Sequence, residues 1–124
     1  MSSDLRDKKS KGVLYSFKYA LEGILHGVIS ERNLKIHTVI AVIVILFGFL
    51  FKISSTEWMF IVIAIGGVYS LELMNTAIER IVDHVSPQYH PLAKQAKDVA
   101  AGAVLIYACM SVIIGCIIFI PKIL

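Results

Sequence analysis

The stretch Leu71-Glu72-Leu73-Met74-Asn75-Thr76-Ala77-Ile78-Glu79-Arg80-Ile81-Val82-Asp83 continues an apolar run that begins near Trp58. Because a helix has 3.6 residues per turn, side chains at i, i+3, i+7 and i+11 share one narrow face. This spacing is shared by four polar residues, with Thr76 beside them: Glu72, Asn75, Glu79 and Asp83. Carboxylates on a hydrophobic helix are costly unless a partner holds them. We therefore expect this face to bind a divalent cation or to line a polar pocket.

The composition is typical of a membrane protein. Of the 124 residues, 57% are hydrophobic, and the mean hydropathy is +0.78. Only 17% are charged, whereas soluble domains carry about 25%. The net charge of +3 is too small and too dispersed to indicate a nucleic-acid partner, and it suits a surface near anionic lipid headgroups. We expect residues 1–124 to form one all-α integral-membrane domain.

Hydropathy divides this domain into a surface helix and three spans. Residues 12–30 show an apolar stripe at helical period and several charges, which predicts an amphipathic helix in the membrane interface. Apolar runs predict three transmembrane helices, at about 31–52, 56–83 and 92–120. The N-terminal residues 1–11 are polar, and they lack the apolar core of a secretory signal.

Capping residues and prolines predict the boundaries of these helices. Ser30 is expected to cap the first span, and the run Ser54-Ser55-Thr56 to cap the second, because serine and threonine oxygens accept free backbone amides. The prolines in Ser86-Pro87-Gln88-Tyr89-His90-Pro91 predict a loop. Pro121 is expected to end the third span.

The basic residues predict the orientation in the membrane. Seven of the twelve lie before or at the start of the first span, and Arg80, Lys94 and Lys97 flank the second loop. The first loop holds only Lys52, and the C-terminus only Lys122. The positive-inside rule then places the N-terminus and the second loop in the cytoplasm and the C-terminus outside. The polar residues consequently gather at the cytoplasmic membrane surface, with Glu72 about 10 Å deeper than Glu79 along the helix axis.

This gathering suits phosphoryl transfer, which depends on positioning and charge neutralisation. Carboxylates at Glu31 and Glu79 could hold Mg²⁺, which prefers oxygen ligands. Lys94 and Lys97 could neutralise phosphate charge. Glu72 could act as general base toward a lipid hydroxyl, with Asn75 orienting it. No Walker loop, kinase catalytic loop or Gly-x-Gly-x-x-Gly is present in the sequence.

Simpler interpretations exist for several residues. Asp83 could pair with Arg80, and Lys94 could be an ordinary interfacial cation. Gly66-Gly67 favours close helix packing within the membrane. Other residues are interpreted as structural. They are Cys109 and Cys116, which are too far apart for a disulfide and are expected to pack, and His26, His37 and His84, which lack metal-ligand spacing.

The stretch from Glu72 to Asp83 resembles the signature of the bacterial integral-membrane diacylglycerol kinase family. The resemblance extends to Ala96-Lys97-Asp98, to the small run Ala100-Ala101-Gly102-Ala103 and to the plan of three spans with an interfacial helix. The segment Ser30-Glu31-Arg32-Asn33-Leu34-Lys35-Ile36-His37 resembles the Gram-positive branch, whose members phosphorylate undecaprenol.

The resemblance implies an ATP- and Mg²⁺-dependent lipid kinase that works as a homotrimer with sites shared between subunits. By this resemblance Glu72 is the proton acceptor, Glu31 and Glu79 bind the divalent cation, and Asn75 and Asp83 support the site. Lys94 is a further supporting candidate because of its charge. The implied ATP contacts include Glu31 and Glu79, together with Ser16, Gln88, Tyr89, His90, Lys97 and Asp98.

Two other classes of function remain open on the residues alone. Buried acids also form proton relays, so the chain could be a small proton-coupled transporter. A non-catalytic membrane scaffold would tolerate replacement of Glu72 and Glu79. Among lipid kinases, the expected acceptor is undecaprenol and the alternative is diacylglycerol, since both offer a primary hydroxyl at the same depth.

Overall fold

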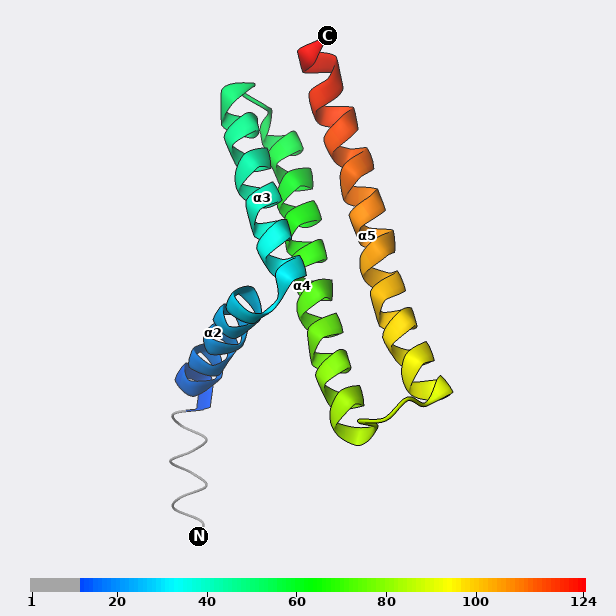
Figure 1. Ribbon diagram of the computed structural model, residues 1–124. Coiled ribbons are helices and arrows are strands. Elements are labelled where there is room, and N and C mark those ends of the chain that lie inside the picture. The colour runs from blue at the N-terminus through cyan, green and yellow to red at the C-terminus, as the bar shows by residue number, and fades with distance from the viewer. Residues whose placement is uncertain (1–11) are drawn as a thin grey trace.

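A computed structural model of the chain describes residues 12–124, which form four helices (Figure 1). They are α2 (Gly12–Ser30), α3 (Arg32–Leu50), α4 (Ser55–Val85) and α5 (Pro91–Ile123). The described residues contain no strand, which confirms the all-α fold. By length and composition α3, α4 and α5 can each cross a membrane. Figure 1 shows these three running side by side, while α2 points away from them.

The bundle has two distinct ends. Figure 1 shows the C-terminus and the α3–α4 turn at one end, here called the turn end, and the α4–α5 loop at the other, here called the loop end. The turn end carries Lys52 and Lys122, and the loop end carries Arg80, Lys94 and Lys97. The separation of basic residues seen in the sequence therefore becomes a separation between the two ends of the bundle.

The apolar core lies at the turn end. Ile53, Ile61 and Ile118 are buried together there, one from the α3–α4 turn and one each from α4 and α5. Trp58 and Phe119 pack against them. An ion pair between Lys122 Nζ and Glu57 Oε2, at 2.9 Å, joins α5 to α4 at the same level. The turn end is thus held by apolar packing, which leaves the polar residues of α4 for the other half of the bundle.

Helix α4 packs against α5 through a glycine. A Cβ added to Gly67 would collide with the ring of Tyr107, and the Tyr107 hydroxyl donates to the carbonyl oxygen of Ile63 at 3.1 Å. The expected close packing is confirmed at Gly67. It does not apply to Gly66 within the protomer, because an added Cβ there meets nothing within 4 Å.

Two helix starts follow from their capping residues. Ser54 and Glu57 form a capping box at the start of α4, with the Glu57 amide donating to Ser54 Oγ at 3.2 Å. Helix α5 begins at Pro91, one residue before the predicted start, because Pro91 is suited to the first helical turn. The Leu92 amide donates to His90 Nδ1 at 3.1 Å, so His90 is its cap.

Two boundary predictions were wrong. Ser30 does not cap α3, since its Oγ donates back to the carbonyl oxygen of His26 at 2.6 Å and Glu31 occupies the N-cap position. Pro121 does not end α5, which continues to Ile123. Proline removes only one amide donor and has a helical φ, so a helix that is already formed can continue for a last turn beyond it.

Most large apolar side chains face outward. In α2 only Gly27 is buried, and Leu14, Leu21 and Leu25 remain between 60% and 77% exposed. Cys109 and Cys116 are free and exposed on α5, so they do not pack inside the protomer as expected. Exposed apolar surface of this extent requires a lipid or protein neighbour.

Candidate active site

Glu72 is the most deeply buried carboxylate of the described residues. It lies on α4, where it is 4% exposed. Its Oε1 lies 3.3 Å from Nε2 of His37 on α3. The sequence predicted that the carboxylates of this face would need a partner, and for Glu72 the partner is a histidine. Because water cannot solvate a carboxylate buried to this degree, the contact with His37 is the main compensation that the fold offers.

Asn75 and Glu79 continue the polar face of α4 toward the loop end. Asn75 is 7% exposed, and its Nδ2 donates to Oε1 of Glu79 at 3.4 Å. Among the described residues, Oδ1 of Asn75 is the one buried side-chain polar atom that has no hydrogen-bond partner. A buried acceptor without a donor costs free energy, so this oxygen is a candidate ligand atom.

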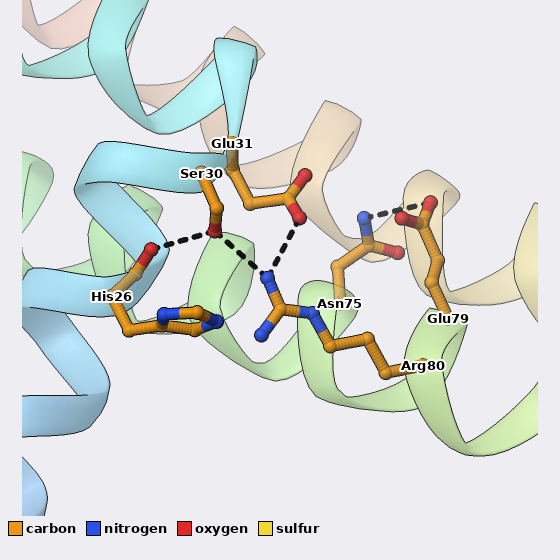
Figure 2. Close-up of polar contacts among 6 residues, drawn as sticks. All are labelled: His26, Ser30, Glu31, Asn75, Glu79 and Arg80. Carbon is orange, nitrogen blue, oxygen red and sulfur yellow. Dashed lines mark hydrogen bonds and ion pairs between the residues drawn. The ribbon is translucent and has the colours of Figure 1, made fainter.

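Glu31 is held by an arginine from α4 (Figure 2). Arg80 Nη2 lies 3.0 Å from Glu31 Oε1 and donates to Ser30 Oγ at 2.8 Å. Ser30 in turn donates to the carbonyl oxygen of His26, so the end of α2, the start of α3 and Arg80 on α4 form one network. The guanidinium contacts Oε1 of Glu31, so a cation that bound this oxygen would compete with Arg80.

Glu31 and Glu79 belong to separate networks within one protomer. Figure 2 shows Glu31 bonded to Arg80 and Glu79 bonded to Asn75, with no interaction drawn between the two pairs. Within residues 12–124, no three histidine, cysteine, aspartate or glutamate side chains converge on a common point. A cation bound by these carboxylates would therefore need further oxygen ligands, such as Asn75 Oδ1, phosphate oxygens or water.

The remaining charged candidates form pairs near the α4–α5 loop. Lys97 on α5 pairs with Asp83 on α4, and Lys94 Nζ lies 2.6 Å from Asp98 Oδ2, one turn along α5. The alternative that Asp83 pairs with Arg80 is wrong, because Arg80 faces Glu31 instead. The Lys97–Asp83 pair links the two helices beside the loop.

The other predicted ATP contacts are exposed. Gln88, Tyr89 and His90 lie in the α4–α5 loop, where Tyr89 is 80% exposed. Ser16 lies on α2, and its Oγ donates to the carbonyl oxygen of Gly12 at 2.6 Å. Within the described residues of one protomer, the Ser16 hydroxyl forms no hydrogen bond with the other predicted site residues. The loop residues and Lys97 thus lie at one end of the bundle, and Ser16 lies on a separate helix.

A pocket of about 340 Å³ lies between α3, α4 and α5. Its walls are mostly aliphatic, and its polar lining residues are His37, Tyr69 and Ser111. Tyr69 lies less than one helical turn before Glu72 on α4, and His37 contacts Glu72 directly. The pocket therefore reaches the level of the buried carboxylate. The pocket is an apolar space whose polar lining includes His37, the residue that contacts Glu72, and this suits a lipid that carries a reactive polar group.

Comparison with protein-family models gives a match to prokaryotic diacylglycerol kinase over residues 18–119. The chain belongs to this family. The match includes α3, α4 and nearly all of α5, together with the whole polar face of α4. The protein is therefore a membrane lipid kinase, and family membership decides for this class over the transporter and the scaffold.

Three relatives of this lipid kinase illustrate the range of the family. This chain is 51% identical over 107 residues to the undecaprenol kinase of Bacillus subtilis strain 168, and the alignment covers 86% of this chain and 87% of that protein. It is 41% identical over 113 residues to a diacylglycerol kinase of Synechocystis, covering 90% of this chain and 65% of that protein. It is 27% identical over 100 residues to the diacylglycerol kinase of Escherichia coli K12, covering 81% and 82%.

The sequence analysis missed two residues that contact candidate site residues. Arg80 was considered only as a partner of Asp83, and His37 was interpreted as structural or interfacial. A signal for His37 was present, because it is the one titratable side chain in the apolar run from Ile36 to Phe51. A polar residue inside a span requires a partner at its own depth, and Glu72 was the available acid.

Proposed function

We propose that this lipid kinase transfers the γ-phosphate of ATP to the primary hydroxyl of undecaprenol. The observation that carries the proposal is the position of Glu72, a buried carboxylate beside an apolar pocket between membrane-spanning helices. The choice of acceptor is supported by the 51% identity to an undecaprenol kinase. Diacylglycerol is the alternative acceptor, supported by the diacylglycerol kinases among the relatives.

In this reaction Glu72 is the proton acceptor. The hydroxyl oxygen of the lipid attacks the γ-phosphorus, its proton passes to the Glu72 carboxylate, and the bond from the γ-phosphorus to the bridging oxygen of ADP breaks. The burial of Glu72 supports this role, because a water-excluded carboxylate can meet a lipid hydroxyl that never leaves the membrane. Asn75, one turn further along α4, supports the site by holding Glu79.

A magnesium ion fits the oxygen-rich face of α4. Asn75 Oδ1 is buried and without a donor, and Glu79 lies beside it, which supports an oxygen-ligand site for a hard cation. Glu79 and Glu31 would hold the ion together with ATP phosphates. The ion would neutralise phosphate charge during transfer.

The nucleotide would lie at the loop end of the bundle, next to the polar face of α4. Lys94, Lys97 and Asp98 from α5, and Gln88, Tyr89 and His90 from the loop, are the proposed contacts, with Ser16 contributed by α2. Asp83 would support the site through its pair with Lys97. The exposure of the loop supports this assignment, because a nucleotide must enter and leave from water.

We further propose a homotrimer with shared sites and a cytoplasmic loop end. The outward-facing apolar side chains support association with other copies or with lipid. The absence of three converging metal-ligating side chains within residues 12–124 supports sites completed by another chain or by ATP. The basic residues at the loop end support its placement in the cytoplasm.

An assay with purified enzyme tests the proposed function. The enzyme would be reconstituted with ATP, Mg²⁺, undecaprenol and diacylglycerol in competition, and each phosphorylated lipid would be separated and quantified. We expect undecaprenyl phosphate as the main product. If phosphatidic acid is the main product, diacylglycerol is the acceptor. If no phosphorylated lipid forms, the proposed substrates are wrong. The Glu72→Gln variant is the control for phosphorylation by a contaminating kinase.

A further inference from the structure

The contact between His37 and Glu72 joins α3 to α4 inside the apolar part of the bundle. The side chain of His37 is 23% exposed and that of Glu72 is 6% exposed. Among residues 12–124, no second side chain hydrogen-bonds to this carboxylate. Among these residues, His37 is therefore the one hydrogen-bonding partner that orients the carboxylate.

The geometry distinguishes the two oxygens of Glu72. A carboxylate only accepts hydrogen bonds, so Nε2 of His37 must carry the proton of the contact, as it does in one neutral tautomer of imidazole. The contact is made to Oε1 alone. Oε2 is left without a donor from the described residues, and it is the oxygen that remains for a proton from elsewhere.

His37 is itself fixed in position by its neighbours. Thr38, the next residue, donates from Oγ1 to the carbonyl oxygen of Leu34 at 2.7 Å and hydrogen-bonds to the hydroxyl of Tyr69 on α4. Leu34 is fully buried. These contacts set the distance between α3 and α4 at the level of His37, so the imidazole has a defined place from which to reach Glu72.

His37 also lines the pocket between α3, α4 and α5. The same side chain therefore contacts both the proposed proton acceptor and the apolar space beside it. A lipid chain in that space would bring its terminal hydroxyl to the end where His37 and Tyr69 lie. The hydroxyl would then approach the side of Glu72 that His37 leaves open.

We propose that His37 is the positioning residue for Glu72. Its Nε2–H holds Oε1, so that Oε2 faces the acceptor hydroxyl and takes its proton as the new bond to phosphorus forms. The inference rests on the proposed role of Glu72 as proton acceptor.

Three substitutions at His37 test the proposal, because they differ in whether the new side chain has an N–H donor that can reach Glu72. His37→Gln places an amide N–H near the position of Nε2, whereas His37→Asn is too short to reach Glu72, and His37→Leu has no donor. We expect turnover to fall about 100-fold in His37→Leu and His37→Asn, as for a misplaced catalytic group, with the KM for ATP little changed. His37→Gln should recover most of the lost turnover.

A control and a double variant separate positioning from structure. Lys122→Gln removes an ion pair between α5 and α4 at the turn end, far from Glu72, and it should lower the melting temperature while retaining turnover. If His37 acts through Glu72, then His37→Leu should cause no further loss in a Glu72→Gln background. A further loss of similar size there would overturn the proposal, as would equal turnover of His37→Gln and His37→Asn.

The wild-type assay distinguishes failure of this inference from failure of the proposed function. If the wild-type protein phosphorylates neither lipid, the proposed substrates are wrong. If it is active and His37→Leu has wild-type turnover, only the role of His37 is wrong. If His37→Leu does not fold, the comparison of the glutamine and asparagine variants still decides, because both keep an amide and differ in reach.

Discussion

Arg80 on α4 holds Glu31 at the start of α3, with Nη2 and Oε1 3.0 Å apart. Both side chains are partly exposed, at 45% and 32%. Ion pairs in this setting contribute about 0.2–1 kcal/mol, so the contact can open when a stronger cation binds the same carboxylate. The pair therefore links the charge of Arg80 to the affinity of the proposed metal site.

We predict that Arg80→Gln lowers the Mg²⁺ concentration needed for half-maximal activity by up to about fivefold, the equivalent of about 1 kcal/mol. The reason is that Glu31 would no longer be shared with a guanidinium. A magnesium titration of the kinase activity measures the change, and Lys122→Gln, which breaks the ion pair at the turn end, is the control. An increased magnesium requirement would mean that Arg80 orients Glu31 rather than competing for it.

Glu79→Gln should reduce turnover by more than about tenfold and raise the Mg²⁺ requirement, because an amide is a weaker ligand for a hard cation than a carboxylate. Glutamine keeps the size of the side chain and an oxygen that can accept from Asn75. Glu57→Gln, at the other end of α4, is the matched control. Wild-type turnover of Glu79→Gln at low Mg²⁺ would show that Glu79 is not a ligand.

Glu72→Gln should lower turnover by about 10²- to 10⁴-fold, since glutamine has the size of glutamate but cannot take a proton. ATP affinity should change little, because Glu72 is buried below the proposed nucleotide contacts. Single-turnover rates and ATP binding would be measured on one preparation. A variant that loses ATP binding but retains the chemical step would place Glu72 in the nucleotide site.

Gly67→Ala should destabilise the bundle by about 1–3 kcal/mol, because the added methyl group collides with Tyr107 and forces α4 and α5 apart. Gly66→Ala is the matched control, since its added carbon meets nothing within 4 Å in the protomer. Thermal unfolding in one detergent would compare the two variants. Equal melting temperatures would show that the contact at Gly67 adapts without cost.

Labelling in intact cells tests the orientation. Cys109 and Cys116 are exposed and would first be replaced by alanine. Cysteines would then be introduced singly at Ser3, which lies outside the described residues, and at Ile123 at the end of α5. We expect an impermeant reagent to label position 123 and not position 3. Labelling of position 3 from outside would place the loop end on the external face.

The elements of the fold could be predicted from local sequence. Three long apolar runs predicted three spans, and the run Ser54-Ser55-Thr56 predicted a helix start, because both signals lie within a few consecutive residues. The polar face of α4 could also be predicted from local sequence, and three of its residues are buried: Glu72, Asn75 and Thr76. Helical period alone places these three side chains on one side.

Contacts between helices could not be predicted in this way. His37 and Glu72, like Asp83 and Lys97, come from different helices, and their pairing depends on how each helix is rotated and crossed against its neighbour. The pattern of one helix does not determine that rotation. Ser30 shows the local limit, since a serine beside a helix end can accept from the next helix or donate back to its own, as it does here.

The length of α4 relates the chemistry to the thickness of the bilayer. Its 31 residues extend about 46 Å, whereas the hydrocarbon layer is about 30 Å thick and the 19 residues of α3 extend about 28 Å. The capping box at Ser54 and the Glu57–Lys122 pair are polar and keep the turn end at the water boundary. Glu72 then lies about 26 Å along the axis from Ser55, just inside the opposite boundary. A thicker membrane would sink this carboxylate below the level of the acceptor hydroxyl, and a thinner one would lift it into the headgroups. We therefore expect the rate of the enzyme to depend on lipid chain length through hydrophobic mismatch.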